Sequence, residues 1–250
     1  MTMADAVLEL KELKAEADGK TVLNGLSFRL EKGKRYALLG SAGSGKTELL
    51  RILAGLQPAA GGEATIFGKP VSDPASRKEV GMLVGEPAFC RELSIANNLE
   101  IQARIVGKPD KRRLGKLMKA LAILPRETGN RSAGSCPASI RVRLGTALAL
   151  VGSPKLLLLD EPFSGLDSDD SIRLRELLEA ECAEREMTVL MTGAFFAEVW
   201  DSATDFLVLG EGKLAAAYTK AELQAKLPDE GMKSGELEAF FQSLRKGEAV

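Results

Sequence analysis

Eight consecutive residues decide what kind of fold this chain adopts: Gly40-Ser41-Ala42-Gly43-Ser44-Gly45-Lys46-Thr47. They fit the pattern G-x-x-x-x-G-K-[ST]. The residues before them, Arg35–Leu39, form a short apolar segment that is typical of a buried strand. The residues after them, Glu48–Ala54, have helical spacing and stop at Gly55. This pattern binds phosphate when it lies between a strand and a helix, so we interpret the stretch as a P-loop.

The P-loop predicts a site for the polyphosphate of a nucleotide. Its glycines let successive backbone N–H groups turn toward phosphate oxygens, and the following helix adds partial positive charge at its N-terminus. We expect Lys46 to reach the β- and γ-phosphates, and the hydroxyl of Thr47 to ligate Mg²⁺. The alternative is a glycine turn that precedes a helix by chance, and the flanking segments argue against it. The residues predicted to bind the nucleotide are Gly40, Ser41, Ala42, Gly43, Ser44, Gly45, Lys46, Thr47 and Glu48.

The composition is that of a globular protein without a strong charge bias. With 250 residues the chain can bury a large core, as one elaborate domain or as two small ones. A net charge of −1 gives no electrostatic reason to expect nucleic acid as the main partner. The longest apolar runs, such as Leu144–Val151, are too short to span a bilayer. The N-terminal segment carries the acids Asp5 and Glu9 and lacks the apolar region of a secretion signal, so we expect a cytoplasmic protein.

Two residue types narrow the possible chemistry further. The chain contains no histidine, which excludes histidine-based zinc sites and histidine-based proton transfer. Its three cysteines, Cys90, Cys136 and Cys182, are widely spaced and odd in number. We therefore expect reduced thiols that serve as small apolar residues.

A second group of candidate site residues follows the apolar segment Lys155–Leu159. A fully apolar strand that ends in acids belongs in the middle of a sheet that is covered on both faces. The C-terminal ends of parallel strands share one edge, so Asp160 is predicted to hold Mg²⁺ beside Thr47, directly or through water. Glu161 points to a different side and is the candidate general base, which accepts a proton from the attacking water. The alternative is a pair of solvated acids that end a strand.

The segments outside the middle of the chain alternate between strand and helix patterns. Leu26, Phe28 and Leu30, for example, alternate with polar residues, which is the period of a half-buried strand. The remaining predicted strands are Val7–Leu13, Leu26–Leu30, Gly61–Gly68, Thr188–Met191, Asp205–Leu209 and Lys213–Ala217, of which the last two form a hairpin. The predicted helices are Asp170–Glu186, Phe195–Trp200, Lys220–Leu227 and Glu236–Leu244.

The middle of the chain, from about Pro87 to Ser153, is helical in character. Ser94 is predicted to cap a helix that runs through Ile105, and Ile140–Val151 is predicted as another helix. One helix is predicted from an apolar stripe formed by Leu114, Leu117, Leu121 and Leu124. The same segment carries basic residues, which we interpret as a solvated face rather than as a membrane or nucleic-acid patch: Lys111, Arg112, Arg113, Lys116 and Lys119.

Taken together, these motifs resemble the nucleotide-binding domain of an ATP-binding cassette (ABC) transporter over nearly the whole chain. The resemblance rests on the P-loop, the helical insertion, Leu156–Pro162 and the following Ser164-Gly165-Leu166-Asp167. Within the family, the chain is most similar to the bacterial drug- and antimicrobial-peptide-export type. Thr21–Phe28 resembles the first strand of that group, and Leu237–Phe241 resembles its C-terminal extension.

The resemblance implies an α/β fold. It implies a P-loop NTPase core with a mainly parallel central sheet, an N-terminal antiparallel β-subdomain and an inserted helical subdomain. We expect one nucleotide-binding domain over residues 1–250, with the ATP-binding core at about 1–86 and 154–219. The helical subdomain is expected at about 87–153, and a C-terminal helical extension at about 220–250.

The resemblance also implies a function. The ligands would be ATP and Mg²⁺, and the activity would be ATP hydrolysis that energises export of a drug, a peptide or a similar substrate. The partners would be a separate transmembrane permease subunit and a second nucleotide-binding domain, in a homodimer or a heterodimer, and no nucleic acid. Two ATP molecules would lie between the P-loop of one domain and the signature loop of the other. The chain would then be cytoplasmic and peripheral at the inner face of the cell membrane.

Three positions and one segment depart from the family pattern. Ala17 stands where an aromatic usually stacks on adenine, Gly85 stands where Gln or Glu is usual, and Ala194 replaces the switch histidine. The signature pattern L-S-G-G-x-x-x-R aligns with the segment Cys136–Arg143, of which only Arg143 matches. ATP binding should survive, because the phosphate and metal residues are intact. Hydrolysis should be slow, since Glu161 lacks its usual supports unless a neighbour such as Glu86 replaces them.

These departures leave alternatives open. In a displaced register, Ser132–Ser135 rather than Pro137–Ser139 would face the phosphate, and we rank that register second. The chain is then either the ATP-hydrolysing subunit of an exporter or a catalytically impaired ATP-binding partner that needs an intact cassette. A third class, cassette proteins that work on ribosomes or DNA, fits less well, because such proteins usually carry paired cassettes or long insertions.

Overall fold

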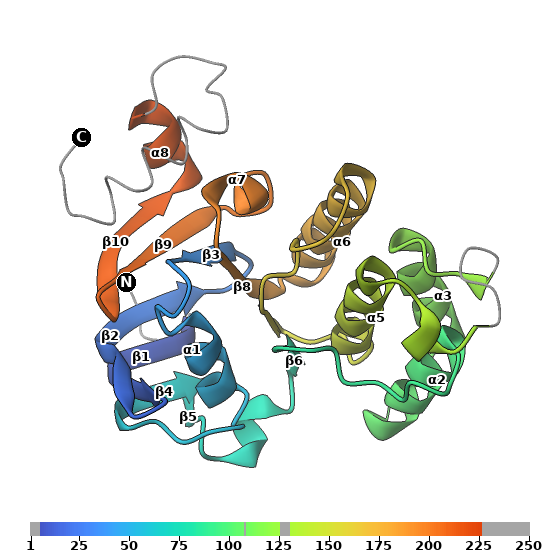
Figure 1. Ribbon diagram of the computed structural model, residues 1–250, viewed down its shortest axis with the longest axis horizontal. Coiled ribbons are helices and arrows are strands. Elements are labelled where there is room, and N and C mark those ends of the chain that lie inside the picture. Colours follow the sequence, from blue (N-terminus) through green and yellow to red (C-terminus); the bar gives the residue numbers. More distant parts are fainter. Residues whose placement is uncertain (1–5, 108, 126–130, 227–250) are drawn as a thin grey trace.

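The computed structural model describes residues 6–107, 109–125 and 131–226, and its two lobes are shown in Figure 1. The larger lobe contains two β-sheets with the helices that pack on them. The smaller one, here called the helical lobe, consists of α2 (Ile95–Ile105), α3 (Lys111–Ala120) and α5 (Ala138–Leu150) with their connections. The predicted α/β fold class is confirmed, with one antiparallel sheet and one mainly parallel sheet. Of the predicted C-terminal helices, Glu236–Leu244 lies outside the described residues.

The first sheet is the predicted antiparallel one. Strands β1 and β2 form a long hairpin because Asp18 and Gly19 both take left-handed backbone conformations, with φ of 49° and 73°. Two such residues make the tight turn that suits the twist of a hairpin. The strand order is β2-β1-β4-β5, with the bounds β1 (Ala6–Ala17), β2 (Lys20–Glu31), β4 (Gly61–Ile66) and β5 (Lys69–Pro70).

The second sheet carries the P-loop strand in its interior. Its order is β10-β9-β3-β8-β7-β6, and only the pair β9–β10 is antiparallel. The bounds are β3 (Arg35–Leu39), β6 (Val80–Leu83), β7 (Leu156–Leu159), β8 (Thr188–Gly193), β9 (Asp205–Gly210) and β10 (Lys213–Thr219). Every one of these strands except β6 was predicted. Strand β8 separates the P-loop strand β3 from β7, which ends in the two acids.

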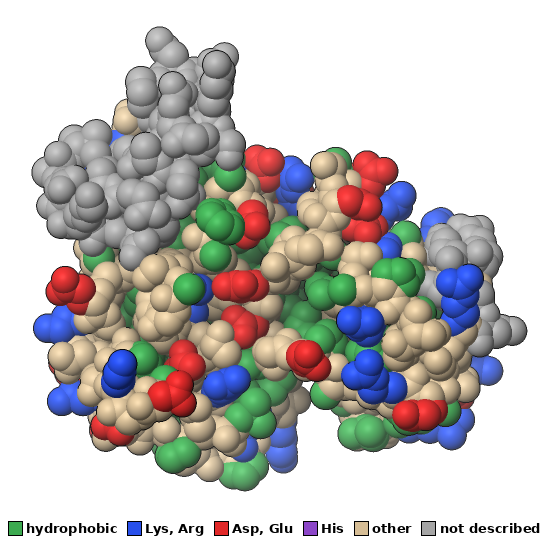
Figure 2. All heavy atoms as spheres, viewed as in Figure 1, with side chains coloured by type: hydrophobic (Ala, Val, Ile, Leu, Met, Phe, Trp, Pro, Cys, Tyr) green, Lys and Arg blue, Asp and Glu red, His purple; other side chains and the backbone are tan. Residues whose placement is uncertain are grey.

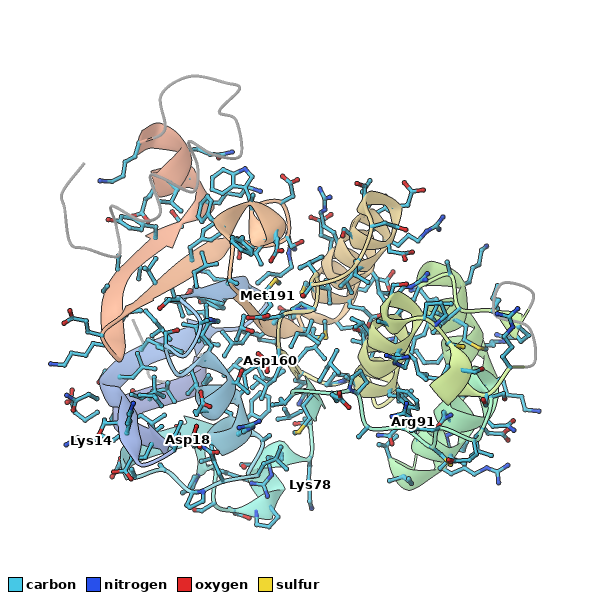
Figure 3. The ribbon with its side chains drawn as sticks, viewed as in Figure 1. Lys14, Asp18, Lys78, Arg91, Asp160 and Met191 are labelled. Carbon is cyan, nitrogen blue, oxygen red and sulfur yellow. The ribbon has the colours of Figure 1, made fainter. Side chains whose placement is uncertain are left out.

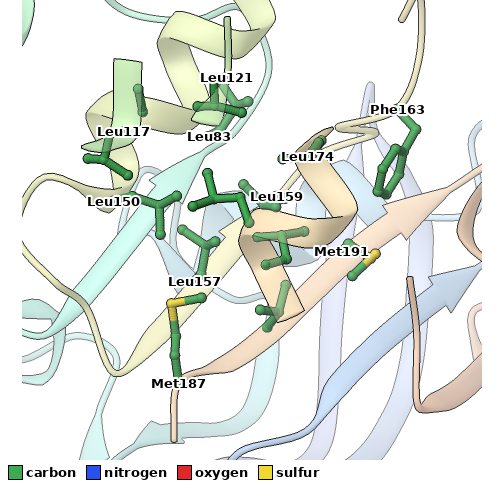
Figure 4. Packing of buried hydrophobic residues seen from close by; sticks show 14 of the residues in the cluster. Leu83, Leu117, Leu121, Leu150, Leu157, Leu159, Phe163, Leu174, Met187 and Met191 are labelled. Atoms are coloured by element: carbon green, nitrogen blue, oxygen red, sulfur yellow. The ribbon is translucent and has the colours of Figure 1, made fainter. Parts of the chain in front are cut away.

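Strand β7 is covered on both faces, as predicted from its run of leucines. Leu156 and Leu158 point into a core shared with the antiparallel sheet and α1 (Lys46–Leu53). Leu157 and Leu159 point into a second core, formed with the helices on the other face of the sheet (Figure 4). Both cores exclude water from apolar side chains, and that burial is the main favourable term in folding. The strand that ends in Asp160 and Glu161 is therefore covered by packed side chains on both faces of the sheet.

The remaining helices of the larger lobe lie close to their predicted bounds. Helix α6 (Ser168–Arg185) is capped by Asp167, whose side chain accepts a hydrogen bond from the N–H of Asp170. Short helices α7 (Phe196–Val199) and α8 (Lys220–Lys226) follow β8 and β10, and a 3₁₀ turn, η2 (Pro74–Arg77), precedes β6. No helix in residues 6–107, 109–125 or 131–226 is long and apolar enough to cross a membrane.

One helix prediction in the helical lobe is wrong. Helix α3 (Lys111–Ala120) ends before the last two leucines of the predicted stripe, Leu121 and Leu124. Ala122 takes a left-handed conformation with φ of 50°, and the N–H groups of Ala122 and Ile123 bond back to carbonyls of the last helical turn. This Schellman-type ending usually needs glycine, so alanine gave no stop signal in the sequence.

The other helices of this lobe were predicted correctly in outline. Ser94 caps α2 (Ile95–Ile105) by accepting a hydrogen bond from the N–H of Asn97, and α5 spans Ala138–Leu150 after a 3₁₀ turn, η3 (Ala133–Ser135). The lobe is fastened to α6 by a buried ion pair between Arg113 and Glu181, in which the guanidinium also reaches the Leu150 carbonyl. The interpretation of the basic residues of α3 as a solvated face is therefore wrong for Arg113, whose side chain is buried.

Candidate nucleotide site

The P-loop connects β3 to α1 and has a backbone that only glycine adopts without strain. Gly43 and Gly45 have φ of 73° and 93°. A Cβ atom on Gly45 would lie 2.7 Å from the side chain of Leu23, so even a methyl group would force the loop away from β2. The loop therefore keeps a shape in which backbone N–H groups can converge on an anion.

Lys46 lies inside this loop rather than in solvent. Its side chain is buried, and its ammonium donates hydrogen bonds to the carbonyls of Gly40 and Ser41 at 2.8 and 3.0 Å. A buried positive charge needs anionic or strongly polar partners, so this position suits a polyphosphate. Lys46 is also the first residue of α1, whose first-turn N–H groups have no partners within the helix.

One buried atom in the loop tests whether a phosphate ligand fits. The hydroxyl oxygen of Ser44 is buried and has no hydrogen-bond partner within the described part of the chain. Buried hydroxyls are normally paired, and an orphaned one marks a place where a ligand or water completes the bonding. The glycine cradle, the buried ammonium and this hydroxyl are all compatible with a bound triphosphate.

Asp160, which is labelled in Figure 3, lies beside the P-loop residue Thr47 as predicted. The hydroxyl of Thr47 lies 3.0 Å from Asp160 Oδ2, and the hydroxyl of Thr192 donates to Asp160 Oδ1 at 2.8 Å. The N–H of Gly85 reaches Oδ2 from the third side at 3.4 Å. Hydroxyl and carboxylate oxygens are the ligands that Mg²⁺ prefers, so Thr47 and Asp160 fit this metal.

Glu161 differs from Asp160 in both exposure and backbone. Its side chain is exposed, whereas Asp160 is half-buried, and its φ of 44° lies in the left-handed region. The backbone N–H of Glu161 donates to the Thr192 hydroxyl at 2.9 Å. Figure 2 shows acidic side chains gathered at the centre of this face, where Figure 3 labels Asp160. The carboxylate of Glu161 is thus accessible to a water molecule at the ligand side of the sheet.

The structure shows where the residues that depart from the family pattern lie. Ala17 ends β1 beside the hairpin turn and offers no aromatic face. Gly85 contributes its backbone N–H to Asp160, while Glu86 lines a groove between β6 and the helical lobe. The suggestion that Glu86 replaces the side chain missing at Gly85 stays a prediction. Ala194 follows β8 and has no polar side chain to direct at a phosphate.

The signature segment begins a helix in the preferred register. Helix α5 starts at Ala138 with Pro137 as its N-cap, and Pro137 provides no side-chain hydrogen bond to the helix end. In contrast, the alternative loop at Ser132–Ser135 contains the turn η3, where the N–H of Gly134 bonds to the carbonyl of Arg91. A Cβ atom at Gly134 would lie 2.8 Å from that arginine side chain, so this turn is packed within its own lobe.

Two contributions to the site were missed from the sequence. Thr192 lies at the end of β8, where it bonds both Asp160 and Glu161, and Gly85 contributes only its backbone. Thr192 belongs to no short motif, and Gly85 was noted only for the side chain that it lacks. A threonine at the end of a strand next to the acidic strand end was the one available indication, and it acquires meaning only when the strand order is known.

Comparisons with known proteins agree with this geometry. The family model described as ABC transporter matches residues 23–164. The chain is 32% identical over 212 residues to the lantibiotic transport ATP-binding protein SrtF of Streptococcus pyogenes, covering 83% of this chain and 89% of SrtF.

Solved structures show the same fold. One described as the ATP-binding subunit of an ABC transporter superposes with a TM-score of 0.80 at 22% identity, over 94% of this chain and 99% of the other. The dimeric ATP-binding cassette MJ0796, in a post-hydrolysis state with ADP and Pi, has a TM-score of 0.75 at 19% identity, over 85% and 98%. The chain thus belongs to the ABC transporter family, as a P-loop ATPase subunit that binds ATP.

Proposed function

We propose that this chain energises export of a peptide, a drug or a similar substrate through a separate membrane subunit. The observation that carries the proposal is the direct contact between the hydroxyl of Thr47 and the carboxylate of Asp160, 113 residues apart in sequence. It joins a phosphate-binding loop to an acidic strand end, and that combination serves phosphoryl transfer. The name of SrtF, a lantibiotic transport protein, supports a peptide as the exported substrate.

In the proposed site, Gly40–Thr47 and the N–H of Glu48 bind the phosphates, with Lys46 supplying positive charge from inside the loop. Thr47 and Asp160 hold the metal ion. Mg²⁺, when bound there, neutralises negative charge on the β- and γ-phosphate oxygens. Glu161 accepts a proton from the attacking water, because its carboxylate is exposed at the same edge of the sheet.

Catalysis by this set is proposed to be weak in the isolated chain. Ala194 and Gly85 supply no side chain to position the γ-phosphate or the water. Removing one group that stabilises developing charge typically costs about 10²–10³ in rate. These same positions favour the second candidate function, an ATP-binding cassette that hydrolyses little and completes its site with an intact partner cassette.

The proposed permease subunit needs a docking surface, and a groove beside β6 supports one. The groove has a volume of about 470 Å³ and is lined by β6, α2 and α5. Leu56 and Val106 line it with 67% and 37% of their surfaces exposed, and Ile105 on α2 is 73% exposed. Exposed apolar side chains beside a concave surface are typical of protein–protein contacts.

The domain bounds, the second nucleotide-binding domain and the location of the chain are part of the same proposal. We propose one domain over residues 1–250, with the core at about 1–86 and 154–219, the helical subdomain at about 87–153 and the extension at about 220–250. A second nucleotide-binding domain would pair with it, and no nucleic acid is involved. Docking on the permease would hold the chain at the cytoplasmic face of the cell membrane.

Binding of ATP–Mg²⁺ tests the proposal directly. Titration calorimetry should detect binding to the parent chain and show its loss or strong weakening in Lys46→Ala, because the variant removes the buried positive charge. Lys69→Ala is the matched control, since Lys69 is an exposed lysine on β5. Equal binding by Lys46→Ala and the parent would show that the assigned site is wrong.

A further inference from the structure

The strand order places the end of β8 between the two halves of the site. In the parallel register, Leu38 of β3 lies opposite Thr192, and Leu159 of β7 lies opposite Met191. The P-loop follows β3 directly, and Asp160 follows β7 directly. Any polar side chain at the end of β8 therefore lies between the phosphate loop and the acidic strand end.

Thr192 occupies that place, and its hydroxyl both donates and accepts a hydrogen bond. The residue is completely buried. Its O–H donates to Asp160 Oδ1 at 2.8 Å, and its oxygen accepts the N–H of Glu161 at 2.9 Å. A hydroxyl has a single proton to donate, and the N–H of Glu161 needs an acceptor. The proton of Thr192 is therefore the one directed at Asp160, and its oxygen accepts from Glu161.

The two hydrogen bonds act on different features of the site. The bond to Asp160 fixes one carboxylate oxygen, so the other oxygen stays directed at Thr47. The bond from Glu161 fixes a peptide group in a left-handed conformation, which a residue with a side chain rarely adopts. Such conformations persist where surrounding contacts hold them, and the Thr192 hydroxyl is one of those contacts.

We propose that Thr192 is the positioning residue of this site, orienting Asp160 toward the metal and Glu161 toward the attacking water. Its β-branched side chain has few χ1 options, which keeps the hydroxyl between the two acids. Ala194, two residues further along, has no group for this task. The nature of the ligand rests on the proposed function, whereas the positioning rests on the contacts of Thr192.

The test compares Thr192→Val with Thr192→Ser. Valine has nearly the same shape but no hydroxyl, whereas serine keeps the hydroxyl. Thr188→Val is the matched control: Thr188 is also fully buried on β8, but at the opposite end, where its hydroxyl accepts the N–H of Gly33 and donates to the Glu31 carbonyl. All three changes are thus made at buried threonine hydroxyls of the same strand.

The main readout is Mg²⁺-dependent binding of a non-hydrolysable ATP analogue, followed by calorimetry and without turnover. Groups that orient a metal ligand typically change metal affinity by about 10–100-fold, so Thr192→Val should need that much more Mg²⁺ for half-saturation. Binding of the analogue in EDTA should match that of the parent, because the P-loop is unchanged. Thr192→Ser and Thr188→Val should both bind like the parent.

The outcomes separate this inference from the proposed function. A parent chain that does not bind the analogue would overturn the proposed function. A parent that binds, together with a Thr192→Val variant of unchanged Mg²⁺ requirement, would overturn the positioning role alone. If circular dichroism shows that Thr192→Val does not fold, Thr192→Cys takes its place, because a thiol is a weaker hydrogen-bonding group. Parent-like Mg²⁺ dependence in Thr192→Cys would likewise overturn the inference.

Discussion

Arg143 of α5 and Asp170 of α6 form an ion pair of 2.8 Å, with only 9% and 10% of their side-chain surfaces exposed. The Arg143 guanidinium also donates to the carbonyl of Leu121 at 3.0 Å. Helix α5 carries the signature segment, and α6 begins at Ser168, in the segment that follows the acidic strand end. The one residue kept from the signature pattern therefore connects the helical lobe to the core.

Replacing Arg143 by methionine should destabilise the protein. Removing one partner of a buried pair leaves the other charge buried and typically costs about 3–5 kcal/mol. Urea unfolding should show this loss as a lower midpoint, and Arg143→Met with Asp170→Asn should recover part of it. Equal stability of Arg143→Met and the parent would show that the pair contributes nothing.

The loss in Arg143→Met should depend on pH. Burial raises the pKa of Asp170 above its ordinary value, while Arg143 opposes the rise. Without Arg143 the pKa rises further, so the folded state binds a proton that the unfolded state has released. The destabilisation should therefore be largest at neutral pH and fade as the pH falls below the ordinary aspartate pKa of about 3.9, where Asp170 becomes protonated in both states.

Base selectivity should be poor. Ala17 offers no face on which adenine can stack, and stacking of a base on an aromatic side chain is worth about 1–3 kcal/mol. ATP and GTP should therefore bind with similar affinity in competition experiments, and Ala17→Tyr should raise the affinity for ATP. A strong preference of the parent for ATP over GTP would show that another residue recognises the base.

Turnover by the isolated chain should lie below the ordinary enzymatic range of about 1–10³ s⁻¹. Glu161 is the remaining side chain suited to act as base, and Glu161→Gln should abolish what activity there is. Ala194→His should raise the rate only where signature contacts still form across a dimer. A parent rate within the ordinary range would contradict the proposed weakness of the site.

The cysteines give a prediction that is independent of the nucleotide. Cys136 and Cys182 are buried apolar residues, as predicted, but the prediction is wrong for the exposed Cys90, whose thiol contacts Glu92. Iodoacetamide should therefore modify native protein at one position, and Cys90→Ala should remove the reaction. Rapid modification of the native Cys90→Ala variant would contradict the burial of the other two thiols.

The buried thiol of Cys182 should make the protein less stable at alkaline pH. Burial raises its pKa from 9.0 to about 11. Between these values the unfolded thiol ionises and the folded thiol does not, so stability should fall as pH rises, by about 1.4 kcal/mol per pH unit at most. Urea unfolding at pH 8 and pH 10 should show this fall, and Cys182→Ala should reduce it.

The sequence predicted those parts of the site that depend on local patterns. Strand β3, the P-loop and α1 follow from one continuous motif, and Leu156–Leu159 reads as buried because no polar residue interrupts it. The proximity of Thr47 and Asp160 was predicted from the rule that parallel strands end at one edge, and their contact confirms it.

What was missed depends on tertiary contacts. Strand β6 has four residues and contains Gly81, at which a Cβ atom would lie 2.1 Å from the carbonyl of Ala149. Glycine at this position allows α5 to approach β6 closely. No sequence pattern within β6 reveals that contact. Thr192 was missed for a similar reason, because its role depends on β8 lying between β3 and β7.

ATP-driven dimerisation should be weak unless an intact partner cassette joins. Pro137, the N-cap of α5, has no N–H to donate, and Ala138 and Ser139 carry Cβ atoms where the family has glycine. A homodimer would then have two sites that both lack signature contacts and a switch histidine.

Sedimentation of Glu161→Gln with excess ATP–Mg²⁺ measures this dimerisation, because slow hydrolysis lets a closed dimer accumulate. We expect mainly monomer, and we expect dimer to increase when Pro137→Ser, Ala138→Gly and Ser139→Gly restore the family residues. The control adds Lys46→Ala to that restored chain, which should abolish the dimer because ATP no longer binds. A tight ATP-dependent homodimer of Glu161→Gln alone would show that Pro137–Ser139 still supports closure, through backbone groups at the start of α5.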